Sequence, residues 1–148
     1  MATIRRECVV AASPEAAWDA IRDVGAVHRR LARGFVSDVR MEPGGVRVVT
    51  FANGMVVREP IVTIDDKAMR LAWAAEGGRT THYNASLTVT DAAGGASIVW
   101  VADFLPDVLS EPIAGLIDAG MAAMQRTLNE TPPAGARREE AEGPTATG

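Results

Sequence analysis

The stretch GGVRVVTFANGMVVREPIVTIDD, residues 44–66, decides the fold. Residues 46–51 and 55–64 are two mostly apolar runs that we interpret with a strand-like period of two, and the pair Asn53-Gly54 separates them. Alternation with a period of two is typical of half-buried strands, and Asn-Gly favours a tight hairpin turn. The stretch therefore predicts two antiparallel strands joined by a hairpin.

The same period-two pattern recurs on both sides of this hairpin. Further strands are predicted over 4–11, 35–41, 68–75, 82–90 and 96–105. The segments between the later strands are short and turn-like: Pro43-Gly44-Gly45, Asp65-Asp66, Gly77-Gly78 and 91–95. Links of this length join antiparallel neighbours, so the pattern predicts one antiparallel sheet of about seven strands.

Helical signals stand at the two ends of this region. Ser13-Pro14-Glu15 is a helix N-cap followed by proline and an acid, and it predicts a short helix, with a second one over 26–31. Ser110-Glu111-Pro112 opens a longer helix, about 30 Å at 1.5 Å per residue. Its apolar residues repeat at helical spacing: Ile113, Leu116, Ile117, Gly120, Met121, Met124 and Leu128.

Length and composition suit one packed domain. The chain has 148 residues, 47% of them hydrophobic, and we expect a single domain over 1–130. Residues 131–148 are rich in proline, glycine and charge without apolar periodicity, so they are predicted to be disordered. A net charge of -4 argues against a nucleic-acid partner.

Cysteine and histidine usage restricts the chemistry further. Cys8 is the only cysteine, and His28 and His82 are the only histidines, so neither an intrachain disulfide nor a Cys/His zinc cage is expected. No stretch reads as a signal peptide or a membrane span. We expect a cytoplasmic protein without cofactor or membrane contact, either a monomer or a homodimer.

Four stretches carry a family resemblance: ASPEAAWDAIRDVG (12–25), residues 44–66, RTTHYNASLTVT (79–90) and SIVWVADFLP (97–106). Together they resemble the START-related and polyketide cyclase superfamily, also called SRPBCC, and most closely its bacterial abscisic-acid-receptor-like and type 2 polyketide cyclase members. The resemblance covers roughly residues 4–130. It implies an α+β helix-grip fold, in which a curved antiparallel sheet of about seven strands surrounds a long C-terminal helix, with two short helices after the first strand.

A fold of this kind encloses a space that only bulky side chains fill, and this chain has few of them. Its seven aromatic residues are the sum of 3 Trp, 1 Tyr and 3 Phe. Small residues are predicted at inward positions: Ala75, Ala85, Ala102, Gly115 and Gly120. The pattern favours an internal cavity for a small, mostly apolar molecule. The alternative is tight packing of small residues against a close helix.

Glu59 and Tyr83 are the predicted catalytic residues. Strand alternation places Glu59 among inward apolar neighbours, where a carboxyl group gains proton affinity and can act as acid or base. The alternative is an ion pair with an arginine at the sheet edge. Tyr83, the only tyrosine, has a hydroxyl that can donate to a ligand carbonyl or stabilise an enolate. For both residues, the resemblance implies a place in the pocket.

Arginine is the other candidate for polarising a carbonyl, because the resemblance implies such a residue in aromatase and cyclase members. Arg47 and Arg58 are the candidates. Strand alternation points Arg58 outward beside the inward Glu59, so only a bulge would admit it to the pocket.

The remaining predicted ligand-binding residues are aromatic, aliphatic or small: Phe35, Ser37, Phe51, Val57, Trp73, Ala85, Trp100, Phe104, Ile117, Met121 and Met124. The aromatic rings serve equally well as plain core, and the methionines as gap fillers. The loops at 53–54 and 77–79 flank the expected mouth.

Three functions fit these observations. The first is a cofactor-independent biosynthetic enzyme that cyclises, dehydrates or isomerises an apolar, polyketide-like carbonyl compound through Glu59 and Tyr83. The second is a carrier or sensor that binds an apolar ligand without changing it. The third is a protein-interaction domain with a filled core.

Overall fold

The computed structural model describes residues 1–130, and one antiparallel sheet of seven strands forms most of it. The strands are β1 (Ala2–Val10), β2 (Val36–Glu42), β3 (Val46–Phe51), β4 (Val56–Asp65), β5 (Arg70–Ala74), β6 (His82–Ala92) and β7 (Gly95–Leu105). Their order in the sheet is β1-β7-β6-β5-β4-β3-β2. The predicted strands are thus confirmed, and each strand from β2 to β7 pairs with its neighbour in the chain.

The hairpin at the centre of the sequence argument has the expected turn. Gly54 has a φ of 91°, and the Asn53 side-chain oxygen accepts a hydrogen bond from the Met55 backbone N–H at 2.9 Å. β3 and β4 pair from this turn onward, and their register sets Arg47 directly opposite Glu59. The hairpin therefore fixes the position of both side chains on one face of the sheet.

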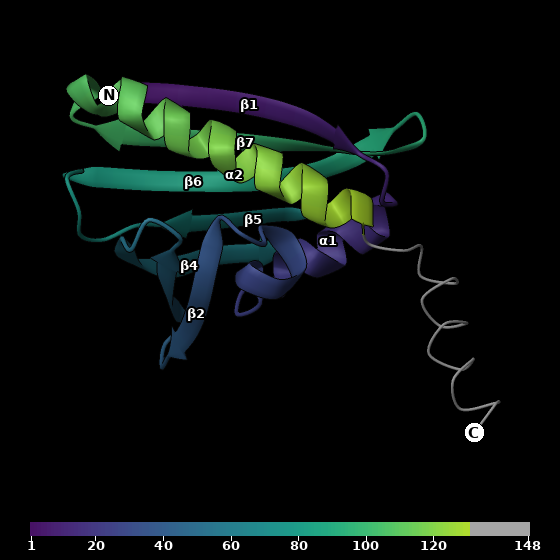
Figure 1. The fold of residues 1–148 in the computed structure, drawn as a ribbon, viewed down its shortest axis with the longest axis horizontal. Coiled ribbons are helices and arrows are strands. Elements are labelled where there is room, and N and C mark those ends of the chain that lie inside the picture. The colour runs from purple at the N-terminus through teal and green to yellow at the C-terminus, as the bar shows by residue number, and fades with distance from the viewer. Residues whose placement is uncertain (131–148) are drawn as a thin grey trace.

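Two short helices follow β1, as predicted. α1 (Pro14–Arg22) is capped by Ser13, whose hydroxyl oxygen accepts from the Ala16 backbone N–H at 3.1 Å, and Pro14 occupies its first turn. The second helix, η1 (Val27–Leu31), has π-helical winding, and both its end residues are buried. Both helices lie near the C-terminal end of the long last helix (Figure 1).

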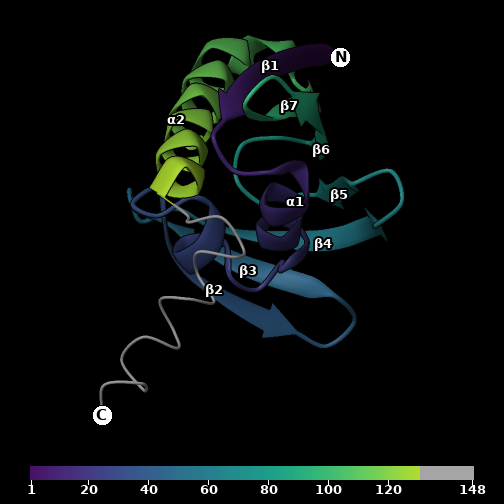
Figure 2. The same ribbon diagram turned by 90° about the vertical axis from the view of Figure 1, so that its right-hand side faces the viewer.

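The last helix, α2 (Ser110–Glu130), follows a single 3-10 turn, η2 (Asp107–Leu109). The sheet curves from β1 to β2, and α2 lies along its concave side (Figure 2). Its buried residues include Ile117, Met121 and Met124, which face the sheet. Together these features form the predicted α+β helix-grip fold.

The predicted disorder of residues 131–148 lies outside the described residues. Within residues 1–130, no helix combines the length and apolar character that crossing a membrane requires.

Candidate functional site

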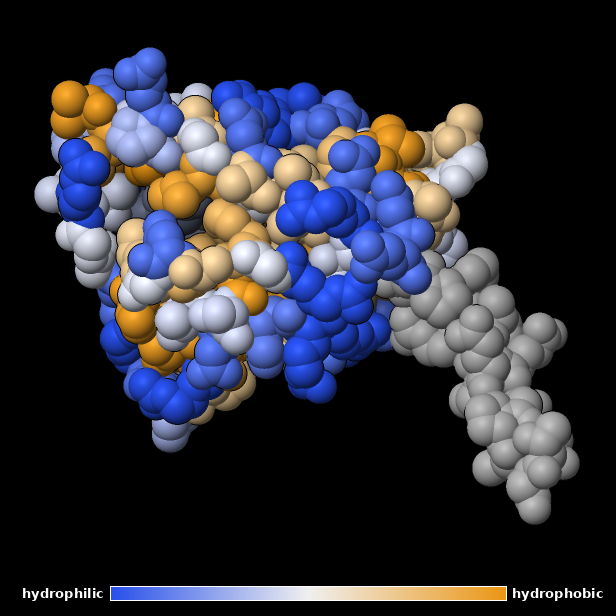
Figure 3. All heavy atoms as spheres, viewed as in Figure 1, coloured by the Kyte–Doolittle hydropathy of each residue, from blue (hydrophilic) through white to orange (hydrophobic). Residues whose placement is uncertain are grey.

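A cavity of about 270 Å³ lies between the concave face of the sheet, η1 and α2. Most of its wall is apolar, and the residues that line it come from nearly every element between η1 and α2. Hydrophobic side chains surround a hollow on the face of the molecule that carries α2 (Figure 3). The cavity argues against the filled-core alternative, because a packed protein interior leaves few voids larger than a water molecule.

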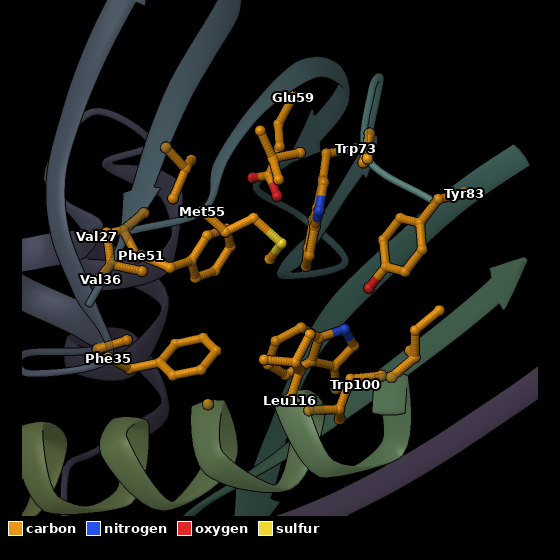
Figure 4. Close-up of a pocket in the computed structure, with 18 of the residues that line it drawn as sticks. Val27, Phe35, Val36, Phe51, Met55, Glu59, Trp73, Tyr83, Trp100 and Leu116 are labelled. Carbon is orange, nitrogen blue, oxygen red and sulfur yellow. The ribbon is translucent and has the colours of Figure 1, made fainter. Parts of the chain in front are cut away.

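Aromatic pairs build much of the wall (Figure 4). Phe35 and Phe51 meet edge to face with ring centroids 5.3 Å apart. Trp73 and Trp100 lie on the other side at 5.9 Å, with their planes tilted by 59°. These rings are rigid and apolar, so they define the shape of the cavity.

Glu59 carries the only carboxylate among the residues that line the cavity. Its side chain is buried, and its Oε1 accepts a hydrogen bond from the Arg47 Nε at 2.8 Å. Arg47 is buried as well, and its guanidinium carbon lies 5.2 Å from the centre of the Trp73 ring. The predicted pairing of Glu59 with an arginine is therefore present, but inside the cavity wall rather than at the sheet edge.

Burial raises the pKa of Glu59, and this effect outweighs the Arg47 charge and hydrogen bond and the nearby Trp73 indole, which all lower that pKa. Its proton affinity is therefore higher than that of an exposed glutamate.

Tyr83 points into the same cavity (Figure 4). Its ring stacks on Phe104 with centroids 6.4 Å apart and an interplanar angle of 23°. Burial, and secondarily the negative charge of Glu59, raise the pKa of its hydroxyl. Tyr83 therefore stays protonated at neutral pH and remains a hydrogen-bond donor.

Most of the predicted ligand-binding residues lie on the cavity wall. They are Phe35, Phe51, Val57, Trp73, Trp100, Ile117 and Met124, in addition to Glu59 and Tyr83. They share one wall because side chains two apart on a strand, and three or four apart on a helix, lie on the same face.

Arg58 and Ser37 lie outside the cavity, so neither candidate is a wall residue; for Arg58 this is the outward position that strand alternation indicated. Arg58 is on the outer face of β4, where it forms ion pairs with Glu42 and Glu76 at 2.9 and 2.6 Å. No bulge occurs at this point of the β3–β4 ladder, so alternation turns Arg58 away from Glu59. The Ser37 hydroxyl is exposed and donates to the Thr50 backbone carbonyl at 3.1 Å.

Ala85 on β6, Phe104 on β7 and Met121 on α2 are buried in the packed core and do not line the cavity. α2 packs closely on β1 at this end of the sheet, and these side chains fill the space between them. Of the small residues predicted inward, Gly115 is exposed, so that position was wrong. Gly120 is buried and lines the cavity.

Sequence reasoning did not place on the cavity wall the residues that η1, η2, the start of α2 and the position after η1 contribute. These are Val27, Leu31 and Ala32, and Leu109, Pro112 and Ile113. The sequence predicted a short helix over 26–31, but nothing in the pattern indicated that this helix faces a cavity.

The mouth involves residues 77–80 in the loop between β5 and β6, all of which line the cavity. Gly77, Gly78 and Arg79 are exposed, as is Pro112 at the start of α2, which also lines the cavity. Among residues 1–130, no group of three or more histidine, cysteine or acidic side chains has an arrangement that would hold a metal ion.

Comparison with solved structures shows the same fold in several proteins. The protein XoxI from Bacillus cereus superposes with a TM-score of 0.77 at 19% identity, over 88% of this chain and 97% of that one. Ara h 8.0201 superposes with a TM-score of 0.68 at 18% identity, over 88% of this chain and 99% of that one. A point mutant of norcoclaurine synthase from Thalictrum flavum was solved with a transition-state analogue. It superposes with a TM-score of 0.63 at 18% identity, over 87% of this chain and 94% of that one.

No curated protein matches the sequence. A family model does: the one described as "Polyketide cyclase / dehydrase and lipid transport" matches residues 1–130. That match covers most of the chain, and the fold and the neighbouring structures agree with it. The chain therefore belongs to the polyketide cyclase/dehydrase and lipid transport family of the START-related, helix-grip superfamily.

Proposed function

We propose that this protein binds a small, mostly apolar carbonyl compound in the cavity and catalyses a proton transfer on it, as in cyclisation, dehydration or isomerisation. One observation carries the proposal: Glu59 and Tyr83, a base and a donor, both line a cavity that is otherwise mostly apolar. Apolar walls exclude water and strengthen the electrostatic effect of both groups on a bound molecule.

Each group has one task in this chemistry. The Glu59 carboxylate removes a proton from the carbon next to the carbonyl, and the C–H electron pair moves to form an enolate. The Tyr83 hydroxyl donates a hydrogen bond to the oxygen that gains negative charge. Because its pKa is raised, Tyr83 keeps its proton and donates throughout.

The enolate then has three outcomes that balance in atoms and charge. Return of the proton from Glu59 to a different carbon isomerises the compound. Transfer of that proton to a departing hydroxyl group releases water and completes a dehydration. Attack of the enolate carbon on a second carbonyl of the same molecule closes a ring, and Glu59 protonates the resulting alkoxide. None of these steps requires an oxidant or a reductant.

The family description and a neighbour support this proposal at the level of class. The family name includes cyclases and dehydrases, and norcoclaurine synthase is by its name a synthase with a related fold. Lipid transport in the same description supports the alternative of binding alone.

Hydrogen–deuterium exchange on 1-tetralone tests the proton transfer directly. Tetralone is a two-ring ketone with exchangeable protons next to its carbonyl, and in D₂O a working base replaces them with deuterium. We expect the native protein to accelerate the exchange, and Glu59→Gln to remove at least about 100-fold of that acceleration. Tyr83→Phe should remove a smaller part. Exchange at the native rate in Glu59→Gln would overturn the assignment.

Glu42→Gln is the matched control for this experiment. Glu42 pairs with Arg58 outside the cavity wall, so its replacement removes a carboxylate without touching the site. Its exchange rate should equal that of the native protein.

A second function, binding without chemistry, is favoured by the Arg47–Glu59 ion pair. A carboxylate held by a guanidinium is a weaker base, and the pair then serves to orient a ligand. Tetralone that binds without accelerated exchange, together with an unaltered small molecule recovered from the purified protein by mass spectrometry, would support the carrier or sensor.

A further inference from the structure

Two tryptophan side chains in the cavity wall have unused hydrogen-bond donors. The indole nitrogens of Trp73 and Trp100 are buried and have no hydrogen-bond partner within residues 1–130. Buried N–H groups are normally paired, because an unpaired one costs about 1–3 kcal/mol. The third tryptophan, Trp18, follows that rule: its indole nitrogen donates to Asp66 at 2.9 Å.

Each unused donor lies beside one of the proposed reacting groups (Figure 4). The Trp73 indole is next to the Glu59 carboxylate, whose pKa it lowers. The Trp100 indole nitrogen is on the side of its ring that faces the Tyr83 hydroxyl, and it lowers the pKa of Tyr83. Neither contact meets the geometry of a hydrogen bond, so both N–H groups remain available.

The Tyr83 side chain lines the cavity together with that of Trp100. The two side chains come from the neighbouring strands β6 and β7, so the sheet fixes their relative position. An oxygen atom that accepts from the Tyr83 hydroxyl therefore comes close to the Trp100 N–H as well.

We infer that the Trp100 indole N–H and the Tyr83 hydroxyl form a two-donor site for a single ligand oxygen. This inference rests on the proposed function and adds Trp100 to its catalytic residues. A carbonyl oxygen has two lone pairs and accepts two such donors, and both bonds strengthen as the oxygen becomes negative. The site therefore selects ligands with an acceptor oxygen at this point over hydrocarbons of the same shape.

The donor that lies beside Glu59 does not belong to this pair. The Trp73 indole faces a carboxylate that already accepts from Arg47. A ligand oxygen placed there would meet the negative charge of Glu59. The geometry thus directs the ligand carbonyl to Trp100 and Tyr83, and the adjacent carbon toward Glu59.

A pair of matched probes tests the inference: 1-tetralone, and tetralin, which has the same two rings without the carbonyl. In nitrogen-15 NMR of the native protein, tetralone should move the Trp100 indole N–H signal downfield, and tetralin should not. The Trp18 signal should stay in place with both probes, because that N–H is bonded to Asp66. Spectra of the Trp→Phe variants assign the signals.

Affinity ratios give a second readout that does not depend on ring packing. The native protein should bind tetralone roughly tenfold more tightly than tetralin, and Trp100→Phe should reduce that ratio roughly fivefold, the effect of one hydrogen bond. Any loss of packing weakens both probes alike and cancels in the ratio. Trp18→Phe is the matched control and should leave the ratio unchanged.

The outcomes separate the two proposals. If both probes bind but the Trp100 signal does not respond and Trp100→Phe keeps the native ratio, the two-donor site is wrong while the cavity remains a binding site. If neither probe binds, the proposed function fails and the two-donor site fails with it.

Discussion

The Arg47 and Glu59 side chains lie directly opposite each other on neighbouring strands, with 2.8 Å between Arg47 Nε and Glu59 Oε1. Both are buried, and Arg47 also lies over the Trp73 ring. A buried ion pair is weak evidence for stability, because desolvation of two charges offsets their attraction. Loss of one partner is nevertheless costly, because the other charge is left unpaired.

Arg47→Met should therefore destabilise the fold by about 3–5 kcal/mol at neutral pH, measured by urea unfolding. The double variant Arg47→Met with Glu59→Leu should recover most of this loss, since no charge is then buried alone. Lower pH should also reduce the loss of stability in Arg47→Met, because the unpaired Glu59 carboxyl becomes neutral on protonation. A single variant as stable as the native protein would contradict this account of the pair.

The raised pKa of Glu59 predicts the pH dependence of catalysis. The base form is the carboxylate, so tetralone exchange should increase as pH rises through the pKa of Glu59, with an inflection above the ordinary glutamate value of 4.5. Arg47, Trp73 and Tyr83 face this carboxyl group, and none of these residue types changes charge in the acid range. An inflection at or below the ordinary value would contradict the prediction, and Glu59→Gln should abolish it.

The raised pKa of Glu59 also makes the stability of the fold depend on pH. The folded state binds the Glu59 proton more tightly than the unfolded state does, so this group stabilises the fold most below the ordinary glutamate pKa. That contribution is lost as pH rises through the raised pKa. Glu59→Gln should remove this part of the pH dependence in urea unfolding measured over the acid range.

The fold was predictable because it depends on local signals. The Asn53-Gly54 turn set the register of the central hairpin, and Ser13 marked the start of α1. Strand alternation also placed Glu59 and Tyr83 on the inner face without any knowledge of the sheet's curvature. These features need only the period of the backbone and the chemistry of single residues.

The boundary between cavity and core was not predictable in the same way. Phe104 and Tyr83 are cross-strand partners with stacked rings, yet only Tyr83 lines the cavity. The difference depends on where α2 approaches the sheet, which is a property of the whole packing. The pairing of Glu59 with Arg47 likewise depends on the register of two strands, which alternation alone does not give.

Gly120 keeps Trp100 in its place. A Cβ atom at Gly120 would lie 2.9 Å from the Trp100 ring, closer than real Cβ contacts, and 3.1 Å from the Phe35 ring, tighter than most of them. Gly120→Ala should therefore displace Trp100 and reduce the preference for tetralone over tetralin. Alanine stabilises a helix by about 1 kcal/mol relative to glycine, and the steric clash at this position should cancel that gain in the free energy of unfolding.

Gly115→Ala is the matched control in the same helix, because a Cβ atom there would meet nothing within 4 Å. It should raise the free energy of unfolding by up to about 1 kcal/mol and leave the tetralone preference unchanged. Equal effects of the two substitutions on ligand preference would show that Gly120 has no part in positioning Trp100.

Filling the cavity should block binding without damage to the fold. Ala75 lines the cavity, so Ala75→Leu places three further carbon atoms in a space of about 270 Å³. Overpacking of a dense core lowers the free energy of unfolding by roughly 1–3 kcal/mol. Because the cavity is open, Ala75→Leu should lower it by less than this. Tetralone binding, measured by calorimetry, should weaken at least about tenfold, because the leucine occupies ligand volume.

Ala122→Leu on the exposed face of α2 is the control and should bind tetralone as the native protein does. A destabilised Ala75→Leu with native affinity would mean that the ligand binds elsewhere, and the cavity would then lose its role.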